Sequence, residues 1–457
     1  MLANVKMSND RIFKLLENLL ISDDNKKIRI LALKALKKKH LNKLLKPLSW
    51  CFKHENSLEF IIPILDTIEE IDDTTFKTTL IRKIKQLQMS HRESGIKILF
   101  NHKTAESYST QKLVNIIKKS LILDFLELNY DNFSFKTKYE DILELELSKL
   151  KINYAKQDLF DIISEFTRLL KSLKKLVITF SSLATFPLSL ESMDSLLSLN
   201  LSFNNIKHFP SFICNLSSLK CLDLRFNRID KIPFEIGRLK SLKSLLLSQN
   251  LLYSLPSSFS ELGSLKRLNL SDNQFTQIPD SVCELKNLEF LNLSLNPLKK
   301  VPESIYNLKH LKTLLINSTY HLSTISKSLG LLHSLKKLNL NNSKFRTIPK
   351  YIGNLVNLET LEIKNNEIRI IPRALKKLKS LKKLDLGWNR IPKIPDWISS
   401  LTSLESLNLW GNLVEYLPDS LVELPNLTHL SLNYDKSNCK IAKLLSILNI
   451  QGLQVPR

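Results

Sequence analysis

The sequence of 457 residues predicts an α/β solenoid, in which short repeats stack into a curved array with a parallel sheet on its concave face, preceded by an all-α region. Two observations predict the array: a leucine motif recurs at a nearly constant step, and ten of the 16 prolines fall in one slot of that period. A third observation separates the N-terminal region, because residues 1–138 show helical periodicity without this repeat.

The motif LxxLxLxxN defines the repeat. Its first leucine lies at Leu173 and marks twelve repeats over residues 173–435, with a step of 23 residues except for one of 24 between Leu311 and Leu335. The leucines at positions 1, 4 and 6 are predicted to point into a core, and the alternation LxLxx predicts a short strand. Stacked strands of this kind form a parallel sheet, and only a stack can bury the apolar faces.

An asparagine usually occupies position 9, where the chain leaves the strand. Its amide can bond backbone groups of its own turn and of the next one, so we predict a structural asparagine ladder. Thr319 and Ser343 replace two successive asparagines, and Ser181 stands in the first repeat. The replacement by Thr319 and Ser343 indicates either a kink in the array that contributes to partner binding or sequence drift. Drift would be tolerated because the hydroxyls can make part of the same hydrogen bonds. The ladder residues are Asn204, Asn227, Asn250, Asn273, Asn296, Asn366, Asn389 and Asn412.

On these residues the chain resembles the leucine-rich-repeat superfamily, over residues 173–435. The 23-residue form with LPxxLxxL resembles the intracellular, Ras-associated type found in scaffold proteins. The resemblance implies a right-handed α/β horseshoe that binds a protein on its concave sheet, with a small GTPase as one candidate partner. Related arrays are fused to kinases, GTPases and ubiquitin ligases, so the resemblance is specific for fold and weak for function.

The segments outside the array have their own expected roles. Residues 1–138 are predicted to form an α-helical domain, either a bundle or a HEAT-like solenoid, because residues 23–36 resemble the helix of a HEAT-type repeat. Further amphipathic stretches lie near residues 57–71, 74–87 and 109–125. Residues 139–172 are predicted to be a junction with an N-terminal capping repeat, and residues 436–457 a C-terminal cap whose helix covers the last repeat.

No motif in the sequence predicts catalysis. The phosphate-binding loop GxxxxGK[ST], the dinucleotide motif GxGxxG after a strand, HExxH and GxSxG are all missing, and the nine histidines have no metal-ligand spacing. We therefore expect no catalytic residue, no metal, no cofactor and no small-molecule substrate, and we expect the protein not to be an enzyme.

The concave face carries the candidate binding residues. Positions 3, 5, 7 and 8 of each repeat are predicted to project from it, and they bring aromatic side chains together with polar ones, as protein-binding hot spots do. The phenylalanines at position 8 are either hot spots or a packed spine, whereas Trp388 and Trp410 favour binding. The candidates are Phe180, Phe203, Asp223, Phe226, Asn269, Asn292, Leu295, Glu362, Asp385, Trp388, Trp410 and Tyr434.

The net charge of +23 allows a basic surface that recruits nucleic acid, an anionic membrane or an acidic partner, or it reflects compositional bias. The concave face is mixed in sign, which weakens the nucleic-acid hypothesis. Five scattered cysteines and no convincing signal peptide predict a cytoplasmic protein. We expect a non-catalytic adaptor or scaffold in signalling. The alternatives are the targeting arm of an effector or ubiquitin-ligase-like enzyme, and a binder of nucleic acid or anionic membrane.

Overall fold

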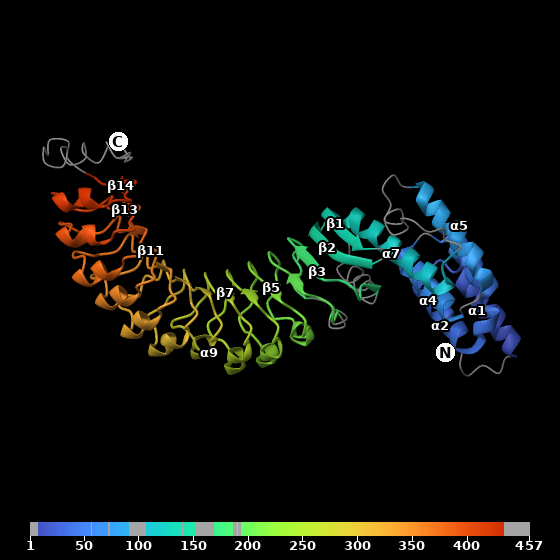
Figure 1. The fold of residues 1–457 in the computed structure, drawn as a ribbon. Helices are drawn as coiled ribbons and strands as arrows, with labels where there is room; N and C mark the ends of the chain where they lie inside the picture. The colour runs from blue at the N-terminus through green and yellow to red at the C-terminus, as the bar shows by residue number, and fades with distance from the viewer. Residues whose placement is uncertain are drawn as a thin grey trace. The chain divides into compact units, whose positions relative to one another are not determined.

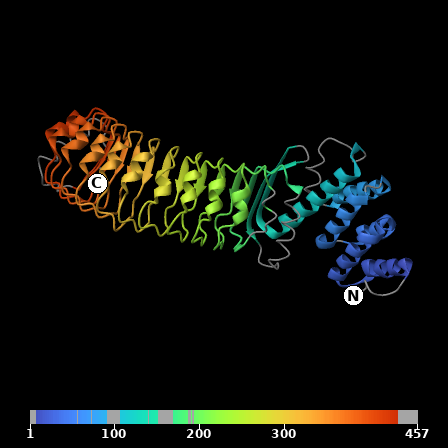
Figure 2. The same cartoon turned by 90° about the horizontal axis from the view of Figure 1, so that it is seen from below.

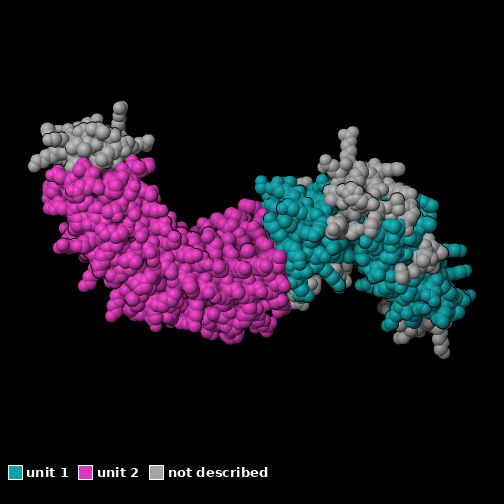
Figure 3. Space-filling model, in the orientation of Figure 1, with its two compact units in different colours: residues 1–177, 187–195 teal, residues 178–186, 196–457 magenta. Residues whose placement is uncertain are grey.

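The computed structural model describes residues 8–55, 57–71, 74–90, 107–138, 141–150, 169–185, 190 and 193–433. The chain divides into two compact units (Figure 3), of which the first comprises residues 1–177 and 187–195 and the second residues 178–186 and 196–457. The predicted C-terminal cap and Tyr434 lie outside the described residues. The chain passes from the first unit to the second within strand β3 (Lys175–Thr179).

The first unit begins with helices (Figure 1), which confirms the helical character predicted for the N-terminal region. Helix α2 begins after Asn25, whose side chain accepts a hydrogen bond from the Lys27 amide. Leu36, Leu48 and Phe60 are fully buried between the helices. None of the described helices is both long and apolar enough to span a bilayer. The helices are α1 (Asn9–Ser22), α2 (Lys26–His40), η2 (Leu41–Lys43), α3 (Leu45–His54), α4 (Leu58–Ile71), α5 (Thr74–Ser90) and α7 (Thr110–Asn129).

The first unit also contains a β-hairpin, which corrects the prediction that all of residues 1–138 are helical. Strand β1 (Tyr130–Lys138) pairs antiparallel with β2 (Asp141–Leu150), with Phe133 opposite Leu147. The physical reason is the period of the sequence: YDNFSFKTK and LELELSKL alternate every second residue, which fits a pleated strand and not a helix. Of the junction predicted over residues 139–172, residues 151–168, with most of the expected capping repeat, lie outside the described residues.

The second unit is the predicted solenoid, and its strands line the inner curve (Figure 1). From β4 to β14, neighbouring strands pair in parallel and in chain order. In β5 the central Leu222 is buried while Cys221 and Asp223 face away from the core. The strands are β4 (Ser198–Asn200), β5 (Cys221–Asp223), β6 (Ser244–Leu246), β7 (Arg267–Asn269), β8 (Phe290–Asn292), β9 (Thr313–Leu315), β10 (Lys337–Asn339), β11 (Thr360–Glu362), β12 (Lys383–Asp385), β13 (Ser406–Asn408) and β14 (His429–Ser431).

Short helices form the convex side of the second unit and lie side by side in Figure 2. Most of them follow the proline of the repeat, because its fixed φ suits the residue before a helix and its missing N–H has no partner there. Ile236 and Leu239 are fully buried and close the core from this side. The helices are η5 (Ser211–Asn215), η6 (Phe234–Arg238), η7 (Ser257–Glu261), α9 (Asp280–Cys283), η8 (Glu303–Asn307), η9 (Lys327–Leu331), η10 (Lys350–Asn354), η11 (Arg373–Lys377), η12 (Asp396–Ser400) and η13 (Asp419–Glu423).

Candidate functional site

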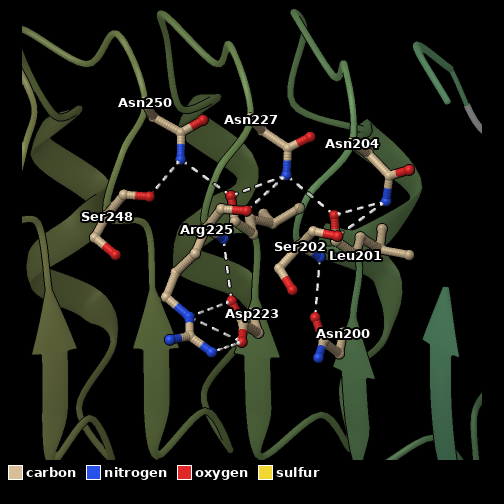
Figure 4. Close-up of polar contacts among 10 residues, drawn as sticks. Asn200, Leu201, Ser202, Asn204, Asp223, Arg225, Asn227, Ser248 and Asn250 are labelled. Carbon is tan, nitrogen blue, oxygen red and sulfur yellow. Dashed lines mark hydrogen bonds and ion pairs between the residues drawn. The ribbon is translucent and has the colours of Figure 1, made fainter. Parts of the chain in front are cut away.

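A row of buried asparagines holds the turns that follow the strands (Figure 4). The side-chain amide of Asn227 donates to the carbonyl oxygens of Leu201 and Leu224, both at 3.0 Å, and its oxygen accepts from the Ile206 amide at 3.1 Å. Asn250 makes the equivalent bonds one repeat later. Each asparagine therefore joins its own turn to the turn of the preceding repeat, so the concave face is a rigid support for the side chains that it carries.

The ladder changes where Thr319 and Ser343 replace asparagine. The Thr319 hydroxyl lies 3.0 Å from the Ile316 carbonyl oxygen and 3.1 Å from the Ser343 hydroxyl. The Ser343 hydroxyl also donates to the carbonyl oxygen of Asn341, at 3.4 Å. The shorter side chains thus bond their own turn and each other, and both remain buried and hydrogen-bonded.

The backbone at position 8 of the repeats is left-handed, with φ between +50° and +58° in the residues with side chains. This conformation costs roughly 1–2 kcal/mol for an ordinary L-residue, and glycine or asparagine adopts it most readily. Sequence reasoning missed this constraint, although Asn365, Asn342 and Gly411 at this position were a signal. The residues are Phe180, Phe203, Phe226, Gln249, Asp272, Leu295, Ser318, Asn342, Asn365, Trp388 and, at +74°, Gly411.

Three phenylalanines at position 8 form a stack at the N-terminal end of this face. The Phe180 and Phe203 ring centroids are 4.3 Å apart, those of Phe203 and Phe226 are 4.0 Å apart, and the planes are inclined by 15° and 14°. Phe180 is nevertheless 50% exposed and Phe226 37% exposed. The rings therefore pack against one another and remain partly exposed to solvent. This arrangement is compatible with both alternatives, a packed structural spine and a surface that contacts a partner.

The C-terminal end of the face carries Trp388, which is 53% exposed. Its ring lies against the backbone of Gly411, where an added Cβ would come within 2.8 Å of the ring. Trp410, one repeat later than Trp388, is only partly exposed, and its carbonyl accepts a hydrogen bond from the Trp388 amide. The backbone of Gly411 thus supports the ring of Trp388.

Polar side chains occupy the face between these two ends. Glu362, which is buried, lies 2.9 Å from the Lys383 ammonium and 2.6 Å from the Asn339 amide nitrogen. The hydrogen bond from Lys383 to Glu362 raises the pKa of the lysine. Asp385 accepts a hydrogen bond from Asn408 at 2.8 Å. These groups are largely paired with one another, so a partner would meet a polar surface that is already satisfied.

Position 5 has a structural role that the sequence did not predict. Asn269 accepts a hydrogen bond from the Ser271 amide at 3.1 Å, and Asn292 accepts one from the Ser294 amide at 3.0 Å. Asp223 accepts from the Arg225 amide and also pairs with its guanidinium at 2.7 Å (Figure 4), which raises the Arg225 pKa. These side chains turn the backbone out of the strand, as Asn and Asp commonly do.

The described residues include no group of three or more histidine, cysteine or acidic side chains that could hold a metal ion. Four described cysteines are free thiols, and three of them are buried. Burial raises the pKa of Cys214 to about 12 and that of Cys283 to about 11, which disfavours the reactive thiolate. Cys221 is exposed on β5.

Comparison with known proteins decides the family. The leucine-rich-repeat model matches residues 217–275, 240–298 and 263–320, and the leucine-rich-repeat region model matches residues 323–455. The structure of a leucine-rich-repeat protein of Leptospira interrogans is 32% identical, with a TM-score of 0.64, over 72% of this chain and 82% of that protein. The chain belongs to the leucine-rich-repeat superfamily. No curated protein matches it significantly.

Other leucine-rich-repeat structures are similar over the array. The ectodomain of the plant receptor kinase GASSHO1/SCHENGEN3 from Arabidopsis thaliana, in complex with CASPARIAN STRIP INTEGRITY FACTOR 2, is 28% identical with a TM-score of 0.54, over 65% of this chain and 36% of that one. The TLR13–ssRNA13 complex gives 25% identity and a TM-score of 0.56, over 63% and 44%. Leucine-rich-repeat proteins generally mediate protein–protein interactions, and their fold is typically non-catalytic.

Proposed function

We propose that this leucine-rich-repeat protein is a non-catalytic adaptor or scaffold that binds a folded protein partner on its concave face. The observation that carries the proposal is the pair of aromatic sites at position 8, the Phe180–Phe203–Phe226 stack and Trp388 on Gly411. Large aromatic side chains held rigidly and left exposed supply most of the binding energy in protein interfaces.

The backbone at position 8 strengthens this argument. Asparagine or glycine would adopt the left-handed conformation at lower cost than phenylalanine or tryptophan. Apart from their contacts with one another, exposed aromatic rings at position 8 therefore do not evidently stabilise the fold. Binding of a partner would account for them, since burial of their apolar edges and faces would then be favourable.

The proposal also covers the kind of partner, the location of the protein and the absence of catalysis. A partner from signalling, such as a small GTPase, rests on the resemblance of the 23-residue repeat to Ras-associated scaffolds. A cytoplasmic location is supported by the exposed Cys221 thiol, which such an environment would keep reduced. The absence of catalysis is supported by the paired polar groups of the concave face and by the buried thiols.

Affinity capture from native lysate, with quantification by mass spectrometry, tests the proposal. The wild-type chain is compared with Trp388→Ala and with Phe226→Ala, each first shown to be folded by circular dichroism. A hot-spot side chain contributes about 2 kcal/mol or more, which corresponds to a roughly 30-fold loss of affinity. We expect one protein to be enriched by the wild type and lost with both variants.

Phe234→Ala is the matched control. Phe234 is 63% exposed but belongs to η6 on the convex side, so its removal should leave capture of the partner unchanged. If the captured proteins are lost equally with Phe234→Ala, or if they persist when Trp388 and Phe226 are both replaced, the concave face is not the binding site.

A further inference from the structure

The loops that follow the strands form one continuous edge of the array. We call this the exit edge and define it by positions 10 to 13 of repeats 2 to 11, from residues 205–208 to residues 413–416. Its loops are stacked by backbone hydrogen bonds: the Arg228 amide donates to Ile206 at 2.8 Å, and the Arg390 amide donates to Ile368 at 2.8 Å. Parallel bridges also join Gln277 to Lys300 and Lys393 to Tyr416. Side chains at equivalent positions therefore line up along the edge.

The exit edge is strongly basic. It carries ten lysines and arginines against three carboxylates, those of Asp230, Glu367 and Glu415, a net charge of +7. All ten cations are exposed. Of the ten cations, Arg346 forms an ion pair with Glu367 at 3.4 Å, and the Lys393 ammonium lies 5.6 Å from the centroid of the Tyr416 ring. The ten cations are Lys207, Arg228, Lys231, Lys299, Lys300, Lys344, Arg346, Arg369, Arg390 and Lys393.

The opposite edge, where the strands begin, is also rich in lysine but differs in pairing. We call it the start edge and define it by the charged residues at position 2 of the repeats and just before position 1. Glu289 lies 2.8 Å from Lys266 and 2.7 Å from Lys312, and Glu359 lies 2.8 Å from Lys336. In repeats 2 to 11 the start edge carries ten lysines against four carboxylates, a net charge of +6, so the two edges are almost equally basic. Five of these lysines form ion pairs, whereas among the ten cations of the exit edge only Arg346 does so within the described residues.

Apolar side chains are interspersed with the cations of the exit edge. Ile370 is 68% exposed and Leu413 is 63% exposed, so both aliphatic side chains are largely in contact with water. Between the loops of repeats 9 and 10 a hollow of about 620 Å³ is lined by the cations Arg369, Arg373 and Lys393, by one carboxylate, Asp396, and by apolar residues that include Ile370. The exposed apolar residues of this edge are Leu251, Tyr253, Tyr320, Ile370, Leu413 and Tyr416.

We propose that the exit edge docks on an anionic membrane surface, with its cations against lipid headgroups and its apolar side chains in the interfacial region. Unpaired cations are attracted by the negative surface potential of such a membrane, and exposed aliphatic side chains gain by leaving water there. A nucleic acid would use the cations and stack on tyrosine rings, but it offers no environment that favours Ile370 or Leu413. This surface is distinct from the concave face, so the inference goes beyond the proposed function.

Co-sedimentation of the full chain with phospholipid vesicles tests the inference. The vesicles are phosphatidylcholine alone or phosphatidylcholine with 30 mol% phosphatidylserine. Four proteins are compared: the wild type; an exit-edge charge variant, Arg369→Glu/Arg390→Glu/Lys393→Glu; an apolar variant, Ile370→Ser/Leu413→Ser; and a control, Lys220→Glu/Lys243→Glu/Lys286→Glu. The control changes the net charge by the same amount on the start edge, at exposed lysines.

We expect the wild type to bind the anionic vesicles and not the neutral ones. The charge variant should lose binding at least tenfold, the apolar variant severalfold, and the control less than twofold. Equal losses with the charge variant and the control would overturn the inference, because the attraction would then depend on net charge alone. Absence of vesicle binding by a folded wild type would overturn it as well.

A nucleic acid is the main competing ligand, and a 20-nucleotide single-stranded RNA is the probe for it. Binding of the RNA that is lost with the charge variant but retained by Ile370→Ser/Leu413→Ser, without binding to vesicles, would assign the exit edge to nucleic acid and overturn the membrane inference. Capture of a protein through Trp388 and Phe226 should be unchanged in all exit-edge variants, so failure of this inference leaves the proposed function standing.

Discussion

The two ends of the concave face support an exposed aromatic residue at position 8 in different ways. Each places a large aromatic residue where the backbone is left-handed, but Phe180, Phe203 and Phe226 support one another, whereas Trp388 rests on Gly411. The first arrangement shares its support among three repeats, so each ring depends on its neighbours. The second depends on one glycine. The comparison teaches that an exposed aromatic residue at this position needs a dedicated support, from stacked rings or from a bare backbone.

The largest effect should come from Gly411→Ala. The methyl group would meet the Trp388 ring at 2.8 Å, and the residue would have to keep a φ of +74°. We expect a loss of about 2 kcal/mol in the free energy of unfolding, measured by urea denaturation, from strain and steric overlap together. The intrinsic fluorescence should change too, and that change should vanish in a Trp388→Phe background.

Gly263→Ala is the control for this substitution. The nearest atom to its added Cβ is the Glu261 carbonyl oxygen at 3.9 Å, so stability should be nearly unchanged. A comparable loss at both glycines would mean that glycine is required in these loops for reasons unrelated to Trp388.

The next effect concerns the middle ring of the stack. Phe203→Ala removes two ring contacts, whereas Phe180→Ala and Phe226→Ala each remove one. Each aromatic pair contributes about 0.5–1.5 kcal/mol beyond burial of area. The free energy of unfolding, measured by urea denaturation, should therefore fall by about 1 kcal/mol more in Phe203→Ala than in either of the other two variants. Equal losses at all three positions would show that the rings are held by the backbone and not by one another.

A smaller effect is expected in the polar centre. Glu362→Gln keeps the shape of the side chain but removes the charge that lies against Lys383. We expect a loss of about 1 kcal/mol and a fall of the Lys383 pKa, which two-dimensional NMR of the lysine side chains can follow. Unchanged stability and an unchanged lysine pKa would show that the ion pair between Glu362 and Lys383 does not stabilise the fold.

Acid should have the least effect, because neither aromatic support contains a titratable group. The paired lysines Lys266 and Lys312 lower the pKa of Glu289 to about 2. A lowered pKa stabilises the fold above the ordinary value near 4.5, and this contribution is lost only as the pH falls toward 2. Between pH 7 and 5 we expect no change in thermal stability or in the near-ultraviolet circular dichroism of the rings. A marked change in that interval would place a titrating group at one of the two ends.

Much of this fold could be predicted from the sequence, because the leucine motif recurs at a regular spacing. The leucines at positions 1, 4 and 6 specify the core, and the asparagines specify the turns, so the solenoid follows from Leu219, Leu222 and Asn227 and their equivalents. The alternation in Tyr130–Lys138 also indicated a strand, but this segment was assigned to the preceding helical region. The local sequence pattern was sufficient to predict the structure wherever a residue type has a single structural role.

The candidate site was less predictable, because it depends on relations between repeats. That Phe203 lies between two other rings could be inferred only after the strands were in register, and the support of Trp388 by Gly411 needs the conformation of both backbones. Asn269 and Asn292 were predicted to be binding residues, yet their side chains also hold the strand exits. A polar residue at a fixed position serves structure and surface alike, and spacing does not separate the two.

The left-handed backbone at position 8 has a consequence for how this surface can evolve. The position tolerates Phe, Gln, Asp, Leu, Ser, Asn, Trp and Gly with nearly the same φ, so the fold sets the conformation and leaves the choice of side chain open. Because each repeat mainly contacts its neighbours, a change at one such position is felt over little more than one repeat on either side. Specificity for a partner can therefore be altered one repeat at a time, while the ladder of asparagines beneath it stays the same.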